Sequence, residues 1–251
     1  MPETIRLDQL LSRFGYCSRR EATGWARAGR VTLDDVAVTR PEQRLDPSAV
    51  RVDGEPVEFP RGLLVAFHKP AGCVCSHNPA EGPLIYDLLP ASWMRRQPAP
   101  VTAGRLDKET SGLILITDDG ALVHRWTSPK HDVVKTYEVT VDRGLPPGLA
   151  EVFASGTLLL RSEAKPCLPA ELEATGARTA RLHIREGKYH QVRRMFASQG
   201  CTVTALHRTR VGDVELGNLA PGEWRPLESG VAFGCLRFAA AQAKSSTREP
   251  N

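Results

Sequence analysis

Two uninterrupted apolar runs, residues 63–67 and 113–116, constrain the fold of this chain most strongly. Each is shorter than a typical helix, and a polar segment that contains glycine follows each run, 68–72 and 117–120. Short apolar runs that end in turn residues are typical of buried strands. We therefore predict two buried strands that end in turns. Within the second turn, we assign Asp118 as the cap of a following helix rather than as a metal ligand or an acid–base group.

Two further segments alternate between apolar and polar side chains. Residues 137–141 and 180–185 place every second side chain on one face, which predicts half-buried strands, and the polar face of 180–185 is basic. A short helix is expected over 190–199 and another strand over 202–206. Strands that recur with irregular connections and few long helices indicate an α+β fold, with a large mixed, mainly antiparallel sheet flanked by helices and loops.

The N-terminal part of the chain has a helical pattern instead. Apolar residues at positions 7, 10, 11 and 14 form one helical stripe. Ser18 and Glu21 match a capping box that opens a second helix. A hairpin is predicted over 31–38, and residues 60–62 are interpreted as a linker.

Composition places the chain among soluble globular proteins. Its 251 residues are 41% hydrophobic and 25% charged, which excludes wholesale disorder and a coiled-coil rod. No apolar run is long enough for a membrane helix, and the first residues do not resemble a secretion signal, so we expect a cytoplasmic protein with no membrane partner. We divide the chain into a domain over 1–60, a domain over 61–240 and a disordered polar tail over 241–251.

Several familiar chemistries are disfavoured because their motifs are missing. The sequence contains no Cys-x-x-Cys or His-Glu-x-x-His pattern, no phosphate-binding loop, no Gly-x-Ser-x-Gly elbow and no Gly-x-Gly-x-x-Gly fingerprint. These absences argue against a zinc site, a nucleotide hydrolase, a serine hydrolase and a dinucleotide enzyme. Residues 142–176 contain no motif that we interpret.

The distribution of charge is more informative than the net charge of +4. Residues 1–30 carry six basic and three acidic side chains, and residues 181–210 carry seven basic side chains and one acidic one. The two clusters form either one surface that follows a polyanion or two separate solvated faces. Charge alone does not separate these possibilities.

The segment 104–112 places the carboxylate of Asp107 close to Arg105, between two glycines and two predicted strands. Loops held by a sheet often carry catalytic groups, and a nearby cation keeps a nucleophilic carboxylate ionised. One aspartate in a loop is a weak signal, however, and the residues alone favour a turn role for Asp107.

Four segments, in order along the chain, resemble the motifs of pseudouridine synthases. Residues 104–113 resemble the catalytic motif of that family. Residues 69–72 resemble its early loop, 135–137 its tyrosine strand and 186–196 its basic motif. The resemblance implies the fold of that family and an enzyme that isomerises uridine in RNA.

The first 60 residues resemble the S4 RNA-binding domain at the openings of both helices, although the loop at 32–35 departs from the usual sequence. An S4 domain joined to this core implies the subgroup that acts on ribosomal RNA. Residues 189–191, 206–208 and 221–227 resemble the small-subunit branch, whose implied target is uridine 516 of 16S RNA. The large-subunit (23S) branch, a non-catalytic assembly factor that binds ribosomal RNA, and a small-molecule enzyme remain as alternatives.

The resemblance also implies roles for individual residues. Asp107 is the essential carboxylate, Tyr137 stacks on the target base, and Arg193 forms an ion pair that orients Asp107. No metal or organic cofactor is implied, because an isomerisation has no net redox change. The partner is ribosomal RNA, naked or in an assembling particle, and an S4 arm on a flexible linker is compatible with a monomer. RNA contacts are expected from Arg6, Arg19, Arg20, Arg27, Arg30, Lys69, Arg105, Lys188, His190, Gln191, Arg194 and Arg208.

Overall fold

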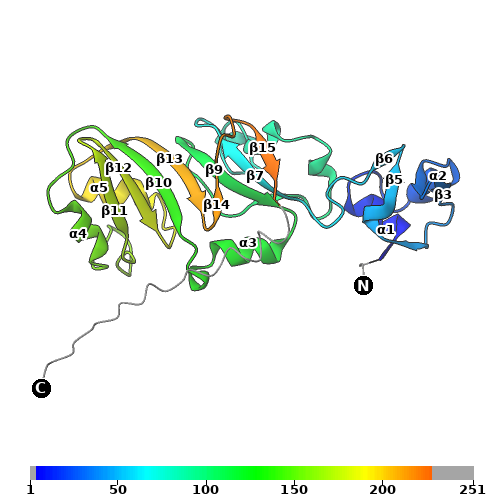
Figure 1. The fold of residues 1–251 in the computed structure, drawn as a ribbon, viewed down its shortest axis with the longest axis horizontal. Helices are drawn as coiled ribbons and strands as arrows, with labels where there is room; N and C mark the ends of the chain where they lie inside the picture. The colour runs from blue at the N-terminus through cyan, green and yellow to red at the C-terminus, as the bar shows by residue number, and fades with distance from the viewer. Residues whose placement is uncertain (1–3, 228–251) are drawn as a thin grey trace, which may run out of the picture.

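The structure is a computed structural model that describes residues 4–227. Figure 1 shows a small N-terminal unit at one end of an elongated molecule, followed by a larger unit built on one long sheet. Among residues 4–227, no helix is both long and apolar enough to cross a membrane. The predicted tail at 241–251 and the last part of the predicted second domain lie outside the described residues.

Two short helices and several short strands form the N-terminal unit. The predicted helical stripe is confirmed, because Leu7, Leu10 and Leu11 are fully buried. The capping box is also confirmed: the Ser18 amide donates to Glu21 Oε2 at 2.9 Å, and the Glu21 amide donates to Ser18 Oγ at 3.4 Å. The elements are β1 (Ile5–Arg6), α1 (Leu7–Arg13), α2 (Ala22–Arg27), β2 (Val31–Leu33), β3 (Val36–Ala37), β4 (Arg44–Leu45), the 3-10 turn Pro47–Ala49, β5 (Val50–Val52) and β6 (Glu55–Pro56).

The predicted hairpin joins β2 to β3. It turns at Asp34 and Asp35, whose φ angles are 49° and 64°. Aspartate tolerates this left-handed region better than most residues, and two consecutive positive φ angles match the twist of the flanking strands. An apolar core drawn from residues 7–57 holds the unit together.

The larger unit is organised around one sheet. It contains β7 (Leu64–Lys69), β8 (Val101–Thr102), β9 (Thr110–Thr117), α3 (Gly120–Thr127), β10 (Lys135–Val141), α4 (Leu149–Ala154), β11 (Glu171–Gly176), β12 (Thr179–Ile184), α5 (Gln191–Ser198), β13 (Val203–Val211), β14 (Val214–Glu215) and β15 (Trp224–Pro226), with 3-10 turns at Pro79–Glu81, Ile85–Leu88, Trp93–Arg95 and Pro129–His131.

This sheet has nine strands within the described residues, and its main path runs β11-β12-β10-β13-β9-β7-β15. Among those strands β13–β9 is the one parallel pair, so the predicted α+β fold with a mixed, mainly antiparallel sheet is confirmed. Helices α4 and α5 pack through a large apolar core on one face, and α3 packs on part of the other face (Figure 1). The sheet therefore has a different environment on each side.

One predicted turn begins later than expected. The sequence predicts that β7 ends before His68, but the strand continues through His68 and Lys69. Both polar side chains find buried partners: His68 Nδ1 lies 2.7 Å from the Leu219 carbonyl oxygen, and Lys69 Nζ is held by backbone carbonyls. Because these partners come from distant segments, the local sequence gives no sign of them.

The assignment of Asp118 as a helix cap is wrong. Asp119 caps α3, since its Oδ1 accepts from the Ala121 amide at 2.8 Å. Asp118 instead accepts from the Leu63 amide at 2.8 Å and forms a buried ion pair with Arg96 at 2.8 Å. A buried carboxylate needs a partner of opposite charge, and Arg96 supplies it from another segment.

Arg96 packs against residues 58–59, directly before the predicted linker 60–62. Its guanidinium donates to the carbonyl oxygens of Glu58 and Phe59 and lies over the ring of Phe14, 4.8 Å from the ring centroid. The Gln97 amide donates to the Arg13 carbonyl oxygen at 2.9 Å. These contacts join the end of α1 to the larger unit, so the N-terminal unit has a defined position on it.

Candidate active site

Asp107 lies on a cavity of about 510 Å³ at the face of the sheet that α5 covers. A cavity of this size is within the range of small-molecule and nucleotide sites. Its lining includes the side chains of Arg105, Asp107, Lys135, Tyr137, Lys188, His190 and Arg208.

Lys69 holds the loop that carries Asp107. Its ammonium donates to the carbonyl oxygens of Thr110 at 2.7 Å, Pro70 at 3.0 Å and Lys108 at 3.1 Å. The side chain is fully buried, and this burial lowers the pKa of the ammonium. The prediction that Lys69 contacts RNA is therefore wrong, because its charge is directed inward to the backbone of the Asp107 loop.

Two basic side chains, Arg193 and His190, face the Asp107 carboxylate. Arg193, the predicted partner, places Nε 3.9 Å from Oδ2, and its guanidinium also donates to the Val203 carbonyl oxygen at 3.0 Å. His190 lies closer, with Nε2 3.3 Å from Oδ1. The sequence predicts an RNA contact for His190 and gives no sign of its contact with Asp107. His190 lies at the N-cap of α5 with a φ of 47°, outside the helix that carries Arg193, so helical spacing does not explain this contact.

Tyr137 and Arg208 form one wall of the cavity. They are directly opposite each other in the β10–β13 pair, and both are almost completely buried. Arg208 Nε donates to the Leu113 carbonyl oxygen at 2.8 Å, and Nη1 lies 3.4 Å from the Tyr137 hydroxyl oxygen. Arg208 is therefore part of the cavity wall, and its predicted contact with the RNA substrate stays a prediction.

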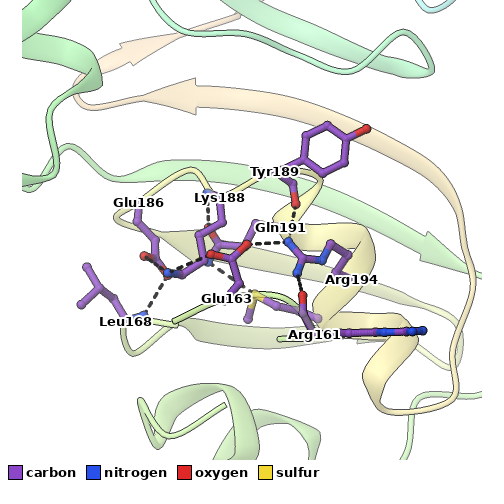
Figure 2. Close-up of polar contacts among 9 residues, drawn as sticks. Arg161, Glu163, Leu168, Glu186, Lys188, Tyr189, Gln191 and Arg194 are labelled. Atoms are coloured by element: carbon purple, nitrogen blue, oxygen red, sulfur yellow. Dashed lines mark hydrogen bonds and ion pairs between the residues drawn. The ribbon is translucent and has the colours of Figure 1, made fainter. Parts of the chain in front are cut away.

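An internal network holds the segment that carries His190 (Figure 2). Glu163 accepts from Arg194 Nη1 at 2.7 Å, and its second oxygen lies 3.7 Å from Lys188 Nζ. Gln191 accepts from the Lys188 amide at 2.9 Å and donates to Glu186 Oε1 at 2.8 Å. Gln191 and Arg194 were predicted to contact RNA, but the structure engages both inside the protein. Glu163 comes from the stretch in which the sequence revealed no motif.

Other predicted RNA-binding residues are accessible. Arg105 is exposed at the cavity. In the N-terminal unit, Arg20 and Arg27 are exposed, Arg6 and Arg19 share Asp8 as partner at 3.0 and 3.1 Å, and Arg30 pairs with Asp53 at 2.6 Å. These positions are compatible with phosphate contacts, which remain predictions.

Lys135 is the cavity residue that sequence reasoning missed. Burial, and then the nearby Arg208 charge, lower its pKa to about 8. A signal was available, because Lys135 has the same parity along β10 as the buried Tyr137, Val139 and Val141. Within the part of the chain that the structure describes, no three His, Cys, Asp or Glu side chains are grouped in a way that would hold a metal ion.

Comparison with known proteins agrees with this geometry. Residues 63–198 match the family described as RNA pseudouridylate synthase, and residues 5–50 match the S4 domain. A solved structure described as "Crystal structure of pseudouridylate synthase" superimposes with a TM-score of 0.65 at 36% identity, covering 93% of this chain and 100% of that chain.

Curated relatives cover almost the whole chain. It is 42% identical over 228 residues to the ribosomal small subunit pseudouridine synthase A of Yersinia pestis, which covers 89% of this chain and 94% of that protein. It is 41% identical over 228 residues to the protein of the same name from Escherichia coli (strain K12), which covers 89% of this chain and 96% of that protein.

Proposed function

The chain belongs to the RNA pseudouridylate synthase family and is an isomerase, and from this premise we propose that it converts uridine 516 of 16S ribosomal RNA to pseudouridine. The observation that carries the proposal is the cavity in which the Asp107 carboxylate faces His190 and Arg193 beside the Tyr137 ring. The names of the similar proteins from Yersinia pestis and Escherichia coli support the small subunit as the source of the substrate.

The reaction detaches uracil from ribose at N1 and rejoins it through C5. A uridine in folded RNA must first leave its stack. Stacking on the Tyr137 ring offsets part of that cost, by roughly 1–3 kcal/mol for a base on an aromatic side chain. Asp107 is the essential carboxylate, and the contacts with Arg193 and His190 orient it.

RNA binding and catalysis are assigned to different units. Residues 1–60 bind structured RNA through Arg6, Arg19, Arg20, Arg27 and Arg30, and residues 61–240 carry out catalysis. The contacts of Arg96 fix the distance between them, so that RNA shape is read by both units together. We place the protein in the cytoplasm, where ribosomal RNA is assembled, as a monomer.

The test compares wild type with Asp107→Asn on 16S RNA, both as a transcript and as a partly assembled particle. Pseudouridine is located by carbodiimide modification and primer extension. We expect one new stop at uridine 516 with wild type, and a loss of about 10³-fold or more with Asp107→Asn, at unchanged RNA affinity. Asp87→Asn, a matched change at an exposed 3-10 turn, should retain full activity.

Three other outcomes contradict parts of the proposal. Turnover retained by Asp107→Asn removes the assigned role of that carboxylate. A stop only in 23S RNA moves the target to the large subunit. Tight RNA binding with no stop in either RNA would leave the assembly-factor alternative.

A further inference from the structure

Two cations on the wall of the cavity, the buried Arg208 and the half-buried Lys135, lack a carboxylate partner. Within residues 4–227, no carboxylate lies at ion-pair distance from Lys135 or Arg208. Lys135 Nζ donates to one carbonyl oxygen, that of Val133 at 3.3 Å, and Arg208 Nη2 is buried with no hydrogen-bond partner. Asp107 is engaged by His190 and Arg193 on its own side. Burying charge without compensation is costly, so this wall is arranged for a negative group that arrives with the substrate.

The position of the two cations identifies that group. A backbone phosphate is charged and hydrated from the start, and the exposed Arg105 is the group available to it. Lys135 and Arg208 instead flank Tyr137, whose ring is assigned to the base: Lys135 is two residues before it on β10, and Arg208 is opposite it on β13. The group beside this ring is uracil, which is neutral in the bound uridine.

Uracil becomes negative only during the reaction. When the C1′–N1 bond breaks, the bonding electron pair stays on the base, and the charge spreads over N1 and the two carbonyl oxygens. The Asp107 carboxylate compensates the electron-poor ribose. The same electron pair is then used at C5 to form the C5–C1′ bond, the proton on C5 leaves, and N1 gains a proton. No electrons or atoms are lost, and the product is an isomer.

We propose that Lys135 and Arg208 are further catalytic residues, which stabilise the detached uracil anion while it turns between N1 and C5 attachment. The inference rests on the proposed function. Arg208 is held in place by the Leu113 carbonyl oxygen and the Tyr137 hydroxyl group, so it needs no reorganisation when the charge develops. Cations aimed at charge that exists only after bond cleavage lower the barrier without strengthening ground-state binding.

The test uses the full-length protein and 16S RNA, with Lys135→Met, Lys135→Arg and the matched exposed variant Lys165→Met. Single-turnover rates at saturating protein and RNA dissociation constants are measured separately. Lys135→Met should lower the rate by about 10²-fold at an RNA affinity within about twofold of wild type. Lys135→Arg should recover most of the rate, and Lys165→Met should equal wild type. Thermal unfolding of each variant shows that it is folded.

The pH profile supplies a readout that a packing role would not change. The pKa of Lys135 is lowered to about 8, so its charge, and with it the wild-type rate, should decline as the pH rises through about 8. Lys135→Arg stays charged and should lack this decline. The charged groups that share the cavity with Lys135 are Arg105, Asp107, Lys108, Lys188, His190 and Arg208, and Glu186 opposes the shift.

The outcomes are distinguishable. An active wild type with an equally fast Lys135→Met overturns the inference alone, as does a variant whose only change is weaker RNA binding. A decline with pH that persists in Lys135→Arg also contradicts it. A wild type inactive on 16S and 23S RNA overturns the proposed function, and this inference with it.

Discussion

The two faces of the β12-β10-β13 region differ in how their basic side chains are paired with carboxylates. On the face away from Asp107, which we call the back face, each arginine has its own carboxylate: Arg181 pairs with Glu173 at 2.9 Å, Arg185 with Asp132 at 2.5 Å and Arg210 with Glu215 at 3.4 Å. On the cavity face, Arg193 and His190 share Asp107, and Lys135 and Arg208 bind backbone carbonyls instead.

The difference shows why an excess of basic residues in sequence does not define one RNA surface. Residues 181–210 carry seven basic side chains, which the strands place on two faces. Along β13, the register shift against β10 places Arg208 at the cavity and Arg210, two residues later, on the back face. The sheet therefore divides the cluster. The back face neutralises its share with acidic neighbours, and the cavity face keeps positive charge where a carboxylate and a base must meet.

Gly112 on β9 lies directly beside the backbone of Arg208 on β13, so this pair of strands leaves no room for a side chain at position 112. A methyl carbon there would lie 2.6 Å from the Arg208 backbone nitrogen and closer still to its carbonyl oxygen, at a φ of +109°. We expect Gly112→Ala to destabilise the protein by about 3 kcal/mol or more, through overpacking and backbone strain. The melting temperature should fall by roughly 10 °C.

The matched control is Gly24→Ala on α2, where a methyl carbon would have no neighbour within 4 Å. That change should leave stability unchanged or raise it by up to about 1 kcal/mol, because alanine favours a helix. Equal melting temperatures for Gly112→Ala and wild type would show that β9 and β13 can move apart without loss of stability, which would contradict the prediction.

Patterns that depend on neighbours in sequence predicted the fold well. The alternation along β10 and β12, the Ser18–Glu21 capping box and the hairpin over 31–38 arise from local geometry, and each was confirmed. The errors have the opposite origin. Asp118 was assigned to the nearest helix, while its partner Arg96 is 22 residues away along the chain.

The site was predictable only in part, for the same reason. The resemblance indicated Asp107, Tyr137 and Arg193; the structure places Asp107 and Tyr137 on one cavity and Arg193 beside Asp107. The contact between His190 and Asp107, and the cation of Lys135, depend on how distant strands and loops meet. Motifs also gave no sign that Arg194 has carboxylate and carbonyl partners within the fold.

The two faces should also differ in how they respond to loss of one arginine. Arg105→Ala should weaken 16S RNA binding roughly fivefold and reduce the slope of log affinity against log salt by about 1, as expected for one lost phosphate contact. Arg181→Ala, on the back face, should change neither quantity, because its guanidinium is already paired with Glu173. Filter binding or fluorescence anisotropy across a salt series measures both. Equal slopes for the two variants would mean that RNA does not distinguish the faces.

The smallest expected effect lies on the back face, at His207. Burial, and then the nearby His68 ring, lower the pKa of this imidazole below its usual value of 6.5, and Ser111 Oγ lies 2.8 Å from its Nδ1. The folded state therefore resists protonation that the unfolded chain accepts. Its contribution to stability is complete above about pH 6.5 and is lost as the pH falls below that value. His207→Gln should flatten the dependence of the free energy of unfolding on pH between 7.5 and 5.5, measured by urea titration, while the alkaline decline in rate assigned to Lys135 stays unchanged. If the acid dependence of stability is unaltered in His207→Gln, another group causes it. If His207→Gln changes both the acid dependence of stability and the alkaline decline in rate, the two faces of the sheet are not independent.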